Sequence, residues 1–210
     1  MNTTALIHVV DDDESLRNAL LRLLAAAGFE ACGYASTGDF LLHPRPDRPG
    51  CLLLDVRLPG PSGLELQAAL QEQGVALPVI FLTGYAEVSS SVRAMKAGAV
   101  DFLAKPVARD TLFDALRRAL AVDALQRTVR DEARRLRARF ASLTLREREV
   151  FDRIVAGRLN KQIADELAIS ERTVKAERAQ CMAKLQVNSA AELGRLAERL
   201  QQLSGDQVEG

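Results

Sequence analysis

The chain has 210 residues and a formal net charge of zero, and a composition of 48% apolar and 27% charged residues is typical of a globular protein, here long enough for two small domains. No stretch approaches the roughly 18 apolar residues of a membrane helix, and the first apolar run is too short and too soon acidic for a signal peptide, so we expect a cytoplasmic protein. Three widely spaced cysteines indicate neither a disulfide framework nor a metal site, and we expect them to be reduced packing residues.

The charge is unevenly distributed along the chain. Residues 1–121 carry 11 basic and 14 acidic side chains, whereas residues 122–210 carry 17 basic and 14 acidic ones. This difference is a weak indication that the second half meets a polyanion.

Apolar runs and amphipathic segments alternate along the first half of the chain. The three clearest helical segments end before Gly28, Gly74 and Gly98, because glycine readily adopts the left-handed conformation that follows a helix. Residues 41–50, with three prolines, are expected to form a surface loop. Strands that alternate with helices indicate an α/β fold with a parallel sheet. The expected strands are residues 5–10, 30–34, 51–54, 79–82 and 99–104.

A long helical segment follows, from about residue 110 to about residue 141. Val122, Val129, Leu136 and Leu143 repeat every seven residues, which is the spacing of a coiled coil. The same stripe also suits a single solvated helix between two domains. The sequence leaves both interpretations open.

A second, all-helical unit is predicted from Leu143 onward. Thr144 and Glu147 have the spacing of a capping box at the start of a helix that ends near Gly157. Further helices are expected at residues 160–167, after Ser170, and at residues 190–203. The tail at residues 205–210 is expected to be disordered.

Polar residues stand at the ends of four of the predicted strands. Asp11 and Asp12 follow the first strand, Asp55 the third, Thr83 the fourth and Lys105 the fifth. Taken singly, the acids and the threonine have an ordinary explanation, because such residues often cap the next helix. However, ligands of an open parallel sheet bind beyond the carboxyl ends of its strands, and all five residues would lie at that edge.

Three carboxylates in one hollow repel one another unless a cation lies among them, and oxygen ligands of this kind suit Mg²⁺ or Mn²⁺. With the metal in place, Asp55 can act as a carboxylate nucleophile on phosphorus. Lys105 would neutralise charge on the phosphoryl oxygens, and Thr83 would donate a hydrogen bond to them.

A haloacid-dehalogenase-type phosphatase is the rival interpretation. The run Asp11-Asp12-Asp13 satisfies a loose D-x-D pattern after an apolar strand, and Asp11 would then be the nucleophile. The sequence lacks the second acidic pair that such enzymes place after a later strand, and Asp55 would have no role, so we consider this interpretation the weaker one.

The segments VVDDD, LLLDVRLPGPSGLEL, VIFLTG and VRAMKAGAVDFLAKP resemble a response-regulator receiver domain over about residues 5–120. The resemblance implies a flavodoxin-like, doubly wound, five-stranded parallel sheet in the order 2-1-3-4-5. It also implies a cis peptide bond between Lys105 and Pro106. The implied site consists of Asp11 and Asp12 as the metal-binding pair, Asp55 as phosphoacceptor and metal ligand, the backbone carbonyl of Arg57 as a further metal ligand, Thr83 as the switch hydroxyl, Lys105 as the site lysine and Phe102 as the switch aromatic residue.

The segments LREREV, NKQIADEL and ERTVK together resemble the LuxR-type DNA-binding domain. In a helix-turn-helix the second helix lies in the major groove, and basic side chains and helix N-termini around it contact phosphates. An exposed charge without a specific role is the ordinary alternative for any one residue. The candidate DNA contacts are Asn160, Lys161, Gln162, Arg172, Thr173, Lys175, Ala176 and Ala179.

Three positions depart from the usual LuxR-type pattern. Glu177 stands where His is usual, Ala176 where a larger residue is frequent, and Ala168 where the turn commonly has Gly. An acid near the phosphates costs affinity, and outward-facing alanines leave little hydrogen-bond readout of the bases. We therefore expect weak DNA binding by the monomer.

The two resemblances cover nearly all of the chain and together indicate a FixJ-type response regulator. The expected parts are a receiver at residues 1–121, a helical linker at residues 122–142 and an all-α, four-helix DNA-binding domain at residues 143–204. We expect Asp55 to receive a phosphoryl group from a sensor histidine kinase. The face formed by the fourth helix, fifth strand and fifth helix would then dimerise, and the chain would bind promoter DNA.

RNA polymerase is a further candidate partner, and no membrane contact is expected. The receiver would catalyse only its own phosphorylation and dephosphorylation, so the protein is not expected to be an enzyme. A regulator that binds DNA without phosphorylation, and uses its receiver only as a dimerisation module, is the alternative.

Overall fold

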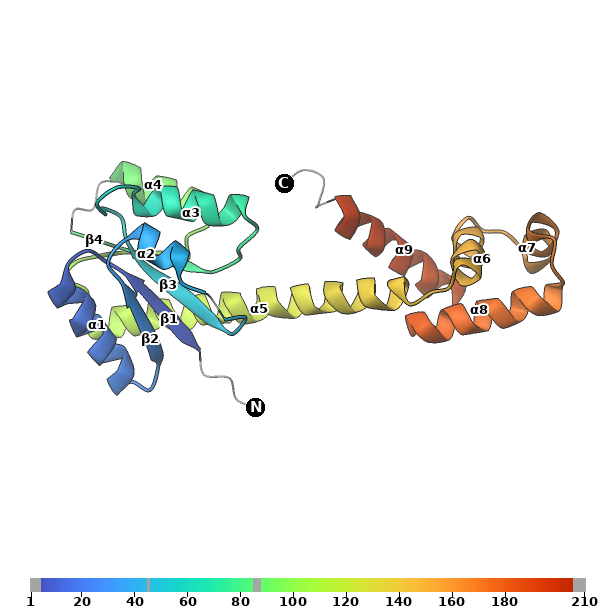
Figure 1. Cartoon of the computed structure of the whole chain (residues 1–210), viewed down its shortest axis with the longest axis horizontal. Helices are drawn as coiled ribbons and strands as arrows, with labels where there is room; N and C mark the ends of the chain where they lie inside the picture. Colours follow the sequence, from blue (N-terminus) through green and yellow to red (C-terminus); the bar gives the residue numbers. More distant parts are fainter. Residues whose placement is uncertain (1–4, 45, 85–87, 206–210) are drawn as a thin grey trace. The chain divides into compact units, whose positions relative to one another are not determined.

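The computed structural model describes residues 5–44, 46–84 and 88–205, without the side chains of residues 88–91, 204 and 205. Its residues group into two units, Met1–Thr128 and Val129–Gly210. Figure 1 shows the strands in the first unit and only helices in the second.

Five parallel strands form one sheet in the first unit, in the order β2-β1-β3-β4-β5. Their bounds are β1 (Leu6–Val10), β2 (Glu30–Tyr34), β3 (Gly50–Asp55), β4 (Val79–Thr83) and β5 (Asp101–Ala104). All residues of β1, β3 and β4 are buried, which is why these strands are nearly continuous apolar runs. The predicted flavodoxin-like sheet and its strand order are confirmed.

Helices cover both faces of the sheet, as a parallel sheet requires. On one face, Leu20 and Leu24 of α1 (Glu14–Ala26) and Leu112 and Leu116 of α5 (Arg109–Ala141) share a core cluster with β1, β3, β4 and β5. On the other face, α2 (Thr37–Leu42), α3 (Gly63–Glu72) and α4 (Val88–Lys96) pack on Leu52, Leu54 and Phe81. The two layers bury the central strands and leave only the strand ends for polar side chains.

Two expectations for this unit were wrong. Leu41 and Leu42, which were assigned to a surface loop, belong to α2, because Ser36 caps that short helix by accepting a hydrogen bond from the Asp39 N–H. Cys51 is a buried free thiol as expected, but Cys32 is exposed on β2, at the edge of the sheet.

A buried ion pair joins α5 to the start of β3. The Asp123 carboxylate, which has no exposed surface, accepts hydrogen bonds from the Gly50 N–H at 3.1 Å and from the Arg127 Nε at 2.9 Å. Arg127 also donates to the Asp47 carboxylate at 2.7 Å and to the Arg48 carbonyl. These contacts hold α5 against the N-terminal edge of the sheet up to residue 127.

The second unit contains the rest of α5 and four more helices, α6 (Leu145–Val155), α7 (Asn160–Leu167), α8 (Glu171–Leu185) and α9 (Ala190–Gly205). Its core includes Val150, Ile163, Val174 and Leu193. From residue 129 onward α5 contributes to this unit, where Ala133 and Leu136 are buried, whereas Val129 is 55% exposed. The exposed part of the stripe suits a coiled coil as well as a single solvated helix, and the structure does not decide between these two interpretations.

Local capping signals of the second unit are confirmed. Thr144 and Glu147 form the predicted capping box of α6, and Ser170 caps α8. Ala168, in the turn between α7 and α8, is left-handed with φ 51°. The end of the predicted disordered tail, residues 206–210, lies outside the described residues. Across the described ranges, no helix is both long and apolar enough to cross a membrane.

Candidate functional site

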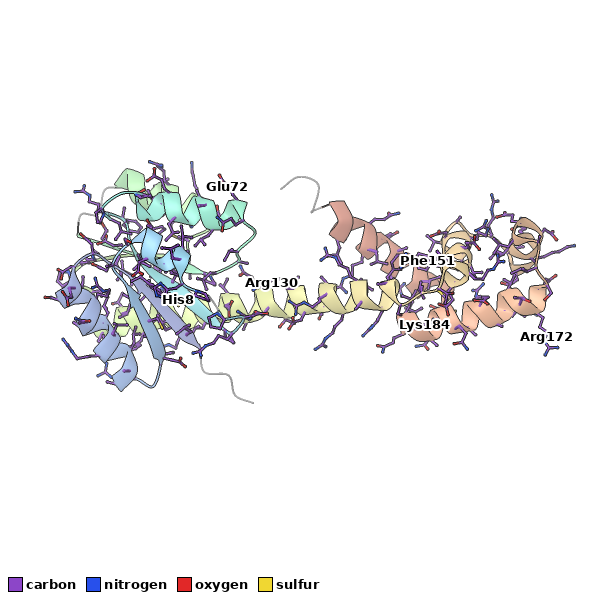
Figure 2. All side chains as sticks on the ribbon, in the orientation of Figure 1. His8, Glu72, Arg130, Phe151, Arg172 and Lys184 are labelled. Carbon is purple, nitrogen blue, oxygen red and sulfur yellow. The ribbon has the colours of Figure 1, made fainter. Side chains whose placement is uncertain are left out.

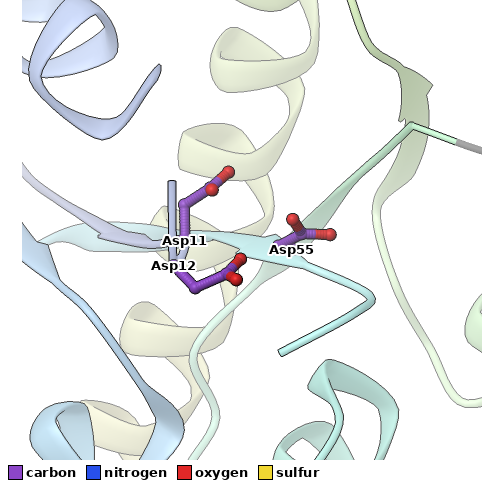
Figure 3. Close-up of side chains that lie close together, drawn as sticks. All are labelled: Asp11, Asp12 and Asp55. Carbon is purple, nitrogen blue, oxygen red and sulfur yellow. The ribbon is translucent and has the colours of Figure 1, made fainter. Parts of the chain in front are cut away.

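Three aspartates meet at the carboxyl ends of β1 and β3. Asp11 and Asp12 directly follow β1, and Asp55 is the last residue of β3. The two strands are hydrogen-bonded neighbours in the sheet, so their ends lie side by side. One carboxylate oxygen from each of the three residues lies within 4.8 Å of the other two (Figure 3). The sequence prediction that these acids share one edge is therefore correct.

Lys105 contacts two of the three acids. Its Nζ lies 2.7 Å from Asp11 Oδ2 and 2.5 Å from Asp55 Oδ2, and all three side chains are largely buried. Burial alone would lower the lysine pKa, but the hydrogen bonds and charges of Asp11 and Asp55 outweigh it, so the pKa of Lys105 is raised. The lysine is therefore charged in the folded protein at neutral pH.

Backbone N–H groups hold the second oxygens of the two buried acids. Asp11 Oδ1 accepts a hydrogen bond from the Asp13 N–H at 3.0 Å, and Asp55 Oδ1 accepts one from the Arg57 N–H at 3.0 Å. Burial raises the pKa of Asp11, although Lys105 and the Asp13 N–H lower it in part. A cation at the site would favour the ionised form of Asp11.

The donor set fits a hard divalent cation. Three carboxylates and one ammonium leave a formal charge of minus two, and the ligand atoms offered by the three acids are all oxygens. Mg²⁺ and Mn²⁺ prefer such ligands, and Mg²⁺ leaves several coordination positions to water or phosphate. Asp11, Asp12 and Asp55 are the residues that would hold it.

The remaining predicted site residues surround this group. Thr83, at the end of β4, is buried, and its carbonyl accepts a 2.7 Å hydrogen bond from the Lys105 N–H. The Lys105–Pro106 peptide bond is cis, as expected. Phe102 on β5 is half-buried, with its ring centroid 6.1 Å from that of Phe81. The switch roles of Thr83 and Phe102, and the metal-binding role of the Arg57 carbonyl, stay predictions.

Two features of the site were not identified from the sequence. Gly63, the first residue of α3, passes so close to β3 that a Cβ there would lie 2.2 Å from the Asp55 carbonyl oxygen. The glycine in PSG, just after the acceptor strand, is the only local signal of this approach. In addition, Arg17 of α1 donates a hydrogen bond to the Asp11 carbonyl, for which the sequence has no local signal.

The candidate DNA-contacting residues lie on α7 and α8 of the second unit. Arg172, Lys175, Ala176 and Ala179 are exposed on α8, and Figure 2 places Arg172 at its N-terminal end. No ion pair that the structure describes involves Arg172 or Lys175, and their role in DNA contact stays a prediction. Lys161, on α7, is likewise exposed.

Three other candidates already make contacts within the unit. Asn160 Oδ1 accepts a hydrogen bond from Arg178 at 3.2 Å, and Gln162 Oε1 accepts one from the Leu159 N–H at the start of α7. The Thr173 hydroxyl lies 2.8 Å from that of Ser170. Direct DNA contacts by these side chains would compete with the internal ones.

Comparison with known proteins matches both units. Residues 7–117 match the family "Response regulator receiver domain", and residues 141–197 match "Bacterial regulatory proteins, luxR family". The chain is 40% identical over 199 residues to Nodulation protein W of Bradyrhizobium diazoefficiens, with 95% of this chain and 88% of that protein covered. It is 40% identical over 196 residues to the response regulator protein TodT of Pseudomonas putida, covering 93% and 86%.

Solved structures of response regulators are similar to this chain. The response regulator StyR matches with a TM-score of 0.82 and 44% identity, over 93% of this chain and 99% of that one. Full-length FixJ from B. japonicum matches with a TM-score of 0.58 and 39% identity, over 96% and 99%. The transcriptional regulatory protein FixJ of Azorhizobium caulinodans is 41% identical over 191 residues, so the relatives include transcriptional regulators.

Both family matches agree with the aspartate cluster at the strand ends and with the helix-turn-helix of the second unit. The chain therefore belongs to the response regulators that join a receiver domain to a LuxR-type DNA-binding domain.

Proposed function

We propose that the chain is a phosphorylation-controlled transcriptional regulator. Asp55 accepts a phosphoryl group from the phosphohistidine of a sensor kinase, with Mg²⁺ or Mn²⁺ held by Asp11, Asp12 and Asp55. The phosphorylated chain dimerises and binds promoter DNA. The observation that carries the proposal is the cluster itself: three carboxylates within 4.8 Å of one another, two of them bonded to a single lysine.

In phosphoryl transfer the protein contributes mainly the positions of the reacting groups and charges that stabilise the transition state. One Asp55 oxygen forms a bond to phosphorus, the bond between phosphorus and the kinase imidazole nitrogen breaks, and its electron pair leaves with the imidazole. Lys105, already bonded to Asp55, turns an N–H toward a phosphoryl oxygen, and the Thr83 hydroxyl donates to another. When bound, the cation supplies positive charge against the carboxylates and the phosphoryl oxygens.

The phosphoryl group changes the face formed by α4, β5 and α5. Thr83 moves toward it and Phe102 turns further inward, which alters the surface that meets a second copy. Two exposed apolar residues of α4 support this choice of face, because Val92 is 46% exposed and Met95 is 48% exposed. A coupling free energy of only about 1–3 kcal/mol between phosphorylation and dimerisation is enough to change promoter occupancy.

Dimerisation compensates for the weak DNA binding of a single DNA-binding domain. Arg172, Lys175 and Lys161 supply the basic contacts of each copy, while Glu177 opposes them. Two readers held together engage repeated half-sites at a high effective concentration, so the dimer binds far more tightly than the monomer. Phosphorylation therefore controls DNA binding without any change in the reader itself.

The test is incubation with acetyl phosphate and MgCl₂, followed by a phosphate-affinity gel, size-exclusion chromatography and DNA footprinting. Wild type and the control Asp131→Asn, which changes an exposed acid of α5, are expected to shift and to dimerise. Asp55→Asn is expected to do neither. A gel shift that survives Asp55→Asn would reject Asp55 as the acceptor.

The same experiment addresses the alternative of a constitutive regulator. If wild type shows no shift even with its cognate kinase, and the footprint does not depend on phosphorylation, the receiver is a dimerisation module only. In that case Asp55→Asn leaves DNA binding unchanged.

A further inference from the structure

The three acids of the site are not held equally. Asp11 and Asp55 each accept one hydrogen bond from Lys105 and one from a backbone N–H. Asp12 is exposed, and in the described part of the chain no hydrogen bond or ion pair holds its carboxylate. The direction of the Asp12 side chain therefore depends on the backbone that carries it.

Three hydrogen bonds in total anchor the backbone before and after Asp12. The Asp11 N–H donates to the Tyr34 carbonyl of β2 at 3.2 Å. The Asp13 N–H donates to Asp11 Oδ1, and the Asp13 carboxylate caps α1 by accepting from the Leu16 N–H at 3.0 Å. Between these anchors lies the peptide that joins Asp11 to Asp12, and its own C=O accepts a further hydrogen bond.

Arg17 holds this peptide. Its Nη1 donates a 2.6 Å hydrogen bond to the Asp11 carbonyl oxygen. Because the peptide unit is planar, fixing the direction of the C=O also fixes the N–Cα bond of Asp12. The guanidinium thus determines where the Asp12 side chain begins, although it does not touch that side chain in any contact that the structure describes.

Packing against β2 places the Arg17 side chain. Its methylene groups lie over Gly33 of β2, where an added Cβ would be 3.2 Å from both Cγ and Cδ of Arg17. Arg17 is half-buried, and none of the ion pairs among the described residues involves it, even though three aspartates lie close by in the loop that precedes α1. The hydrogen bond of its guanidinium that the structure describes is with the Asp11 carbonyl.

We propose that Arg17 is a positioning residue of the cation site, which holds the Asp11–Asp12 peptide so that the Asp12 carboxylate faces Asp11 and Asp55 before the metal arrives. The proposal rests on the proposed function, since it assumes a divalent cation at this site. Without the hydrogen bond the peptide rotates more freely, and cation binding must then order it.

The test is titration of the full-length, unphosphorylated chain with MgCl₂ in a calorimeter, so that the measured quantity is the Mg²⁺ dissociation constant. Arg17→Met keeps most of the side-chain stem and removes the donor. We expect it to weaken Mg²⁺ binding about tenfold, as is typical when a partner of a metal ligand is lost. Arg22→Met, a matched control on α1, removes the same charge from an exposed residue and is expected to leave the constant nearly unchanged.

Two further measurements separate positioning from general damage. Thermal unfolding without metal is expected to differ little between Arg17→Met and wild type, whereas the Asp12 and Asp13 amide protons are expected to exchange faster with solvent in the variant. Arg17→Lys, which keeps the charge and one donor on a shorter tip, is expected to recover part of the affinity. If Arg17→Met fails to fold, the Mg²⁺ dissociation constant of Arg17→Lys is compared with those of wild type and Arg22→Met. The positioning role then predicts a loss of affinity in Arg17→Lys that is smaller than tenfold but absent from Arg22→Met.

The possible failures are distinguishable. If wild type takes up no Mg²⁺, the cation site of the proposed function is wrong, and the role of Arg17 falls with it. If wild type binds Mg²⁺ and Asp12→Asn does not, but Arg17→Met binds as wild type does, only the positioning role is refuted. Equal losses in Arg17→Met and Arg22→Met would show an effect of net charge and would also refute it.

Discussion

Lys105 and Asp55 form a 2.5 Å ion pair between the ends of β5 and β3, although fifty residues separate them in the chain. The same ammonium contacts Asp11 at 2.7 Å. One lysine thus offsets part of the repulsion among three acids in the metal-free protein, and a divalent cation would offset the rest.

Lys105→Met is expected to destabilise the receiver when no metal is present. Removing one partner of a largely buried ion pair typically costs about 3–5 kcal/mol, because the remaining charges are left uncompensated. Mg²⁺ should restore a large part of this loss. Urea unfolding with and without MgCl₂ measures both effects, with Lys96→Met as the control for an exposed lysine. A loss that Mg²⁺ leaves unchanged would contradict the shared-charge explanation.

The capping acid of α6 should make the stability of the second unit depend on pH. Burial raises the pKa of Glu147, but hydrogen bonds from Lys184 and the Thr144 N–H outweigh it, so the pKa is lowered below its ordinary value of 4.5. The stabilisation is therefore fully present above pH 4.5 and is lost as the pH falls through the lowered pKa.

Hydrogen exchange of α6 amides in the full chain, measured at several pH values, checks this expectation. Wild type should lose protection as the pH falls below 4.5, whereas Glu147→Gln should have lower protection at neutral pH and a weaker dependence on pH. Glu149→Gln, an exposed neighbour, is the control. The idea fails if both variants keep the wild-type pH profile.

The ion pair between Asp123 and Arg127 is expected to hold the first part of α5 on the receiver. Asp123→Asn removes a fully buried charge that binds the Gly50 N–H and Arg127, so it should lower the free energy of unfolding by about 3 kcal/mol. Exchange of α5 amides near residue 123 should rise as well. Asp114→Asn, on the exposed side of the same helix, serves as control, and equal losses in both variants would argue against a special role of the buried pair.

The turn between α7 and α8 contains a strained residue. Ala168 adopts φ 51°, and a left-handed conformation costs a residue with a Cβ about 1 kcal/mol or more. Ala168→Gly is therefore expected to stabilise the second unit by about 1 kcal/mol, seen in denaturant unfolding. The same change at Ala183, an exposed position inside α8, should destabilise by about 1 kcal/mol. Destabilisation by Ala168→Gly would show that the turn does not carry this strain.

Glu177 is expected to weaken DNA binding. It lies half-buried on α8, beside the exposed basic residues that face phosphates in the proposed function. Glu177→Gln removes a charge that repels phosphates and should tighten binding about threefold at low salt, with a smaller gain at high salt. Fluorescence anisotropy with labelled promoter DNA measures this, and Glu198→Gln on α9 controls for net charge. A gain that does not depend on salt would point to a different cause.

Most of the architecture was predictable because its signals are local. The central strands β1, β3 and β4 are nearly continuous apolar runs, and Gly28, Gly74 and Gly98, which follow the predicted helices, all have positive φ. The capping box at Thr144 and Glu147 is a pattern of four consecutive residues. Helix α2 was missed because its six residues are too few to display helical periodicity, and its capping residue Ser36 stands in a stretch that also resembles a loop.

The sequence by itself determined the alternation of the five strands with most of the helices along the chain and the presence of acids at the strand ends, because backbone propensity and capping act between near neighbours in the chain. Only the tertiary structure decided that Lys105 bonds Asp11 and Asp55, that Arg17 binds the Asp11 carbonyl, and that Asp123 anchors Gly50. These contacts need particular side chains at particular distances in a folded sheet, and no periodic pattern encodes such distances.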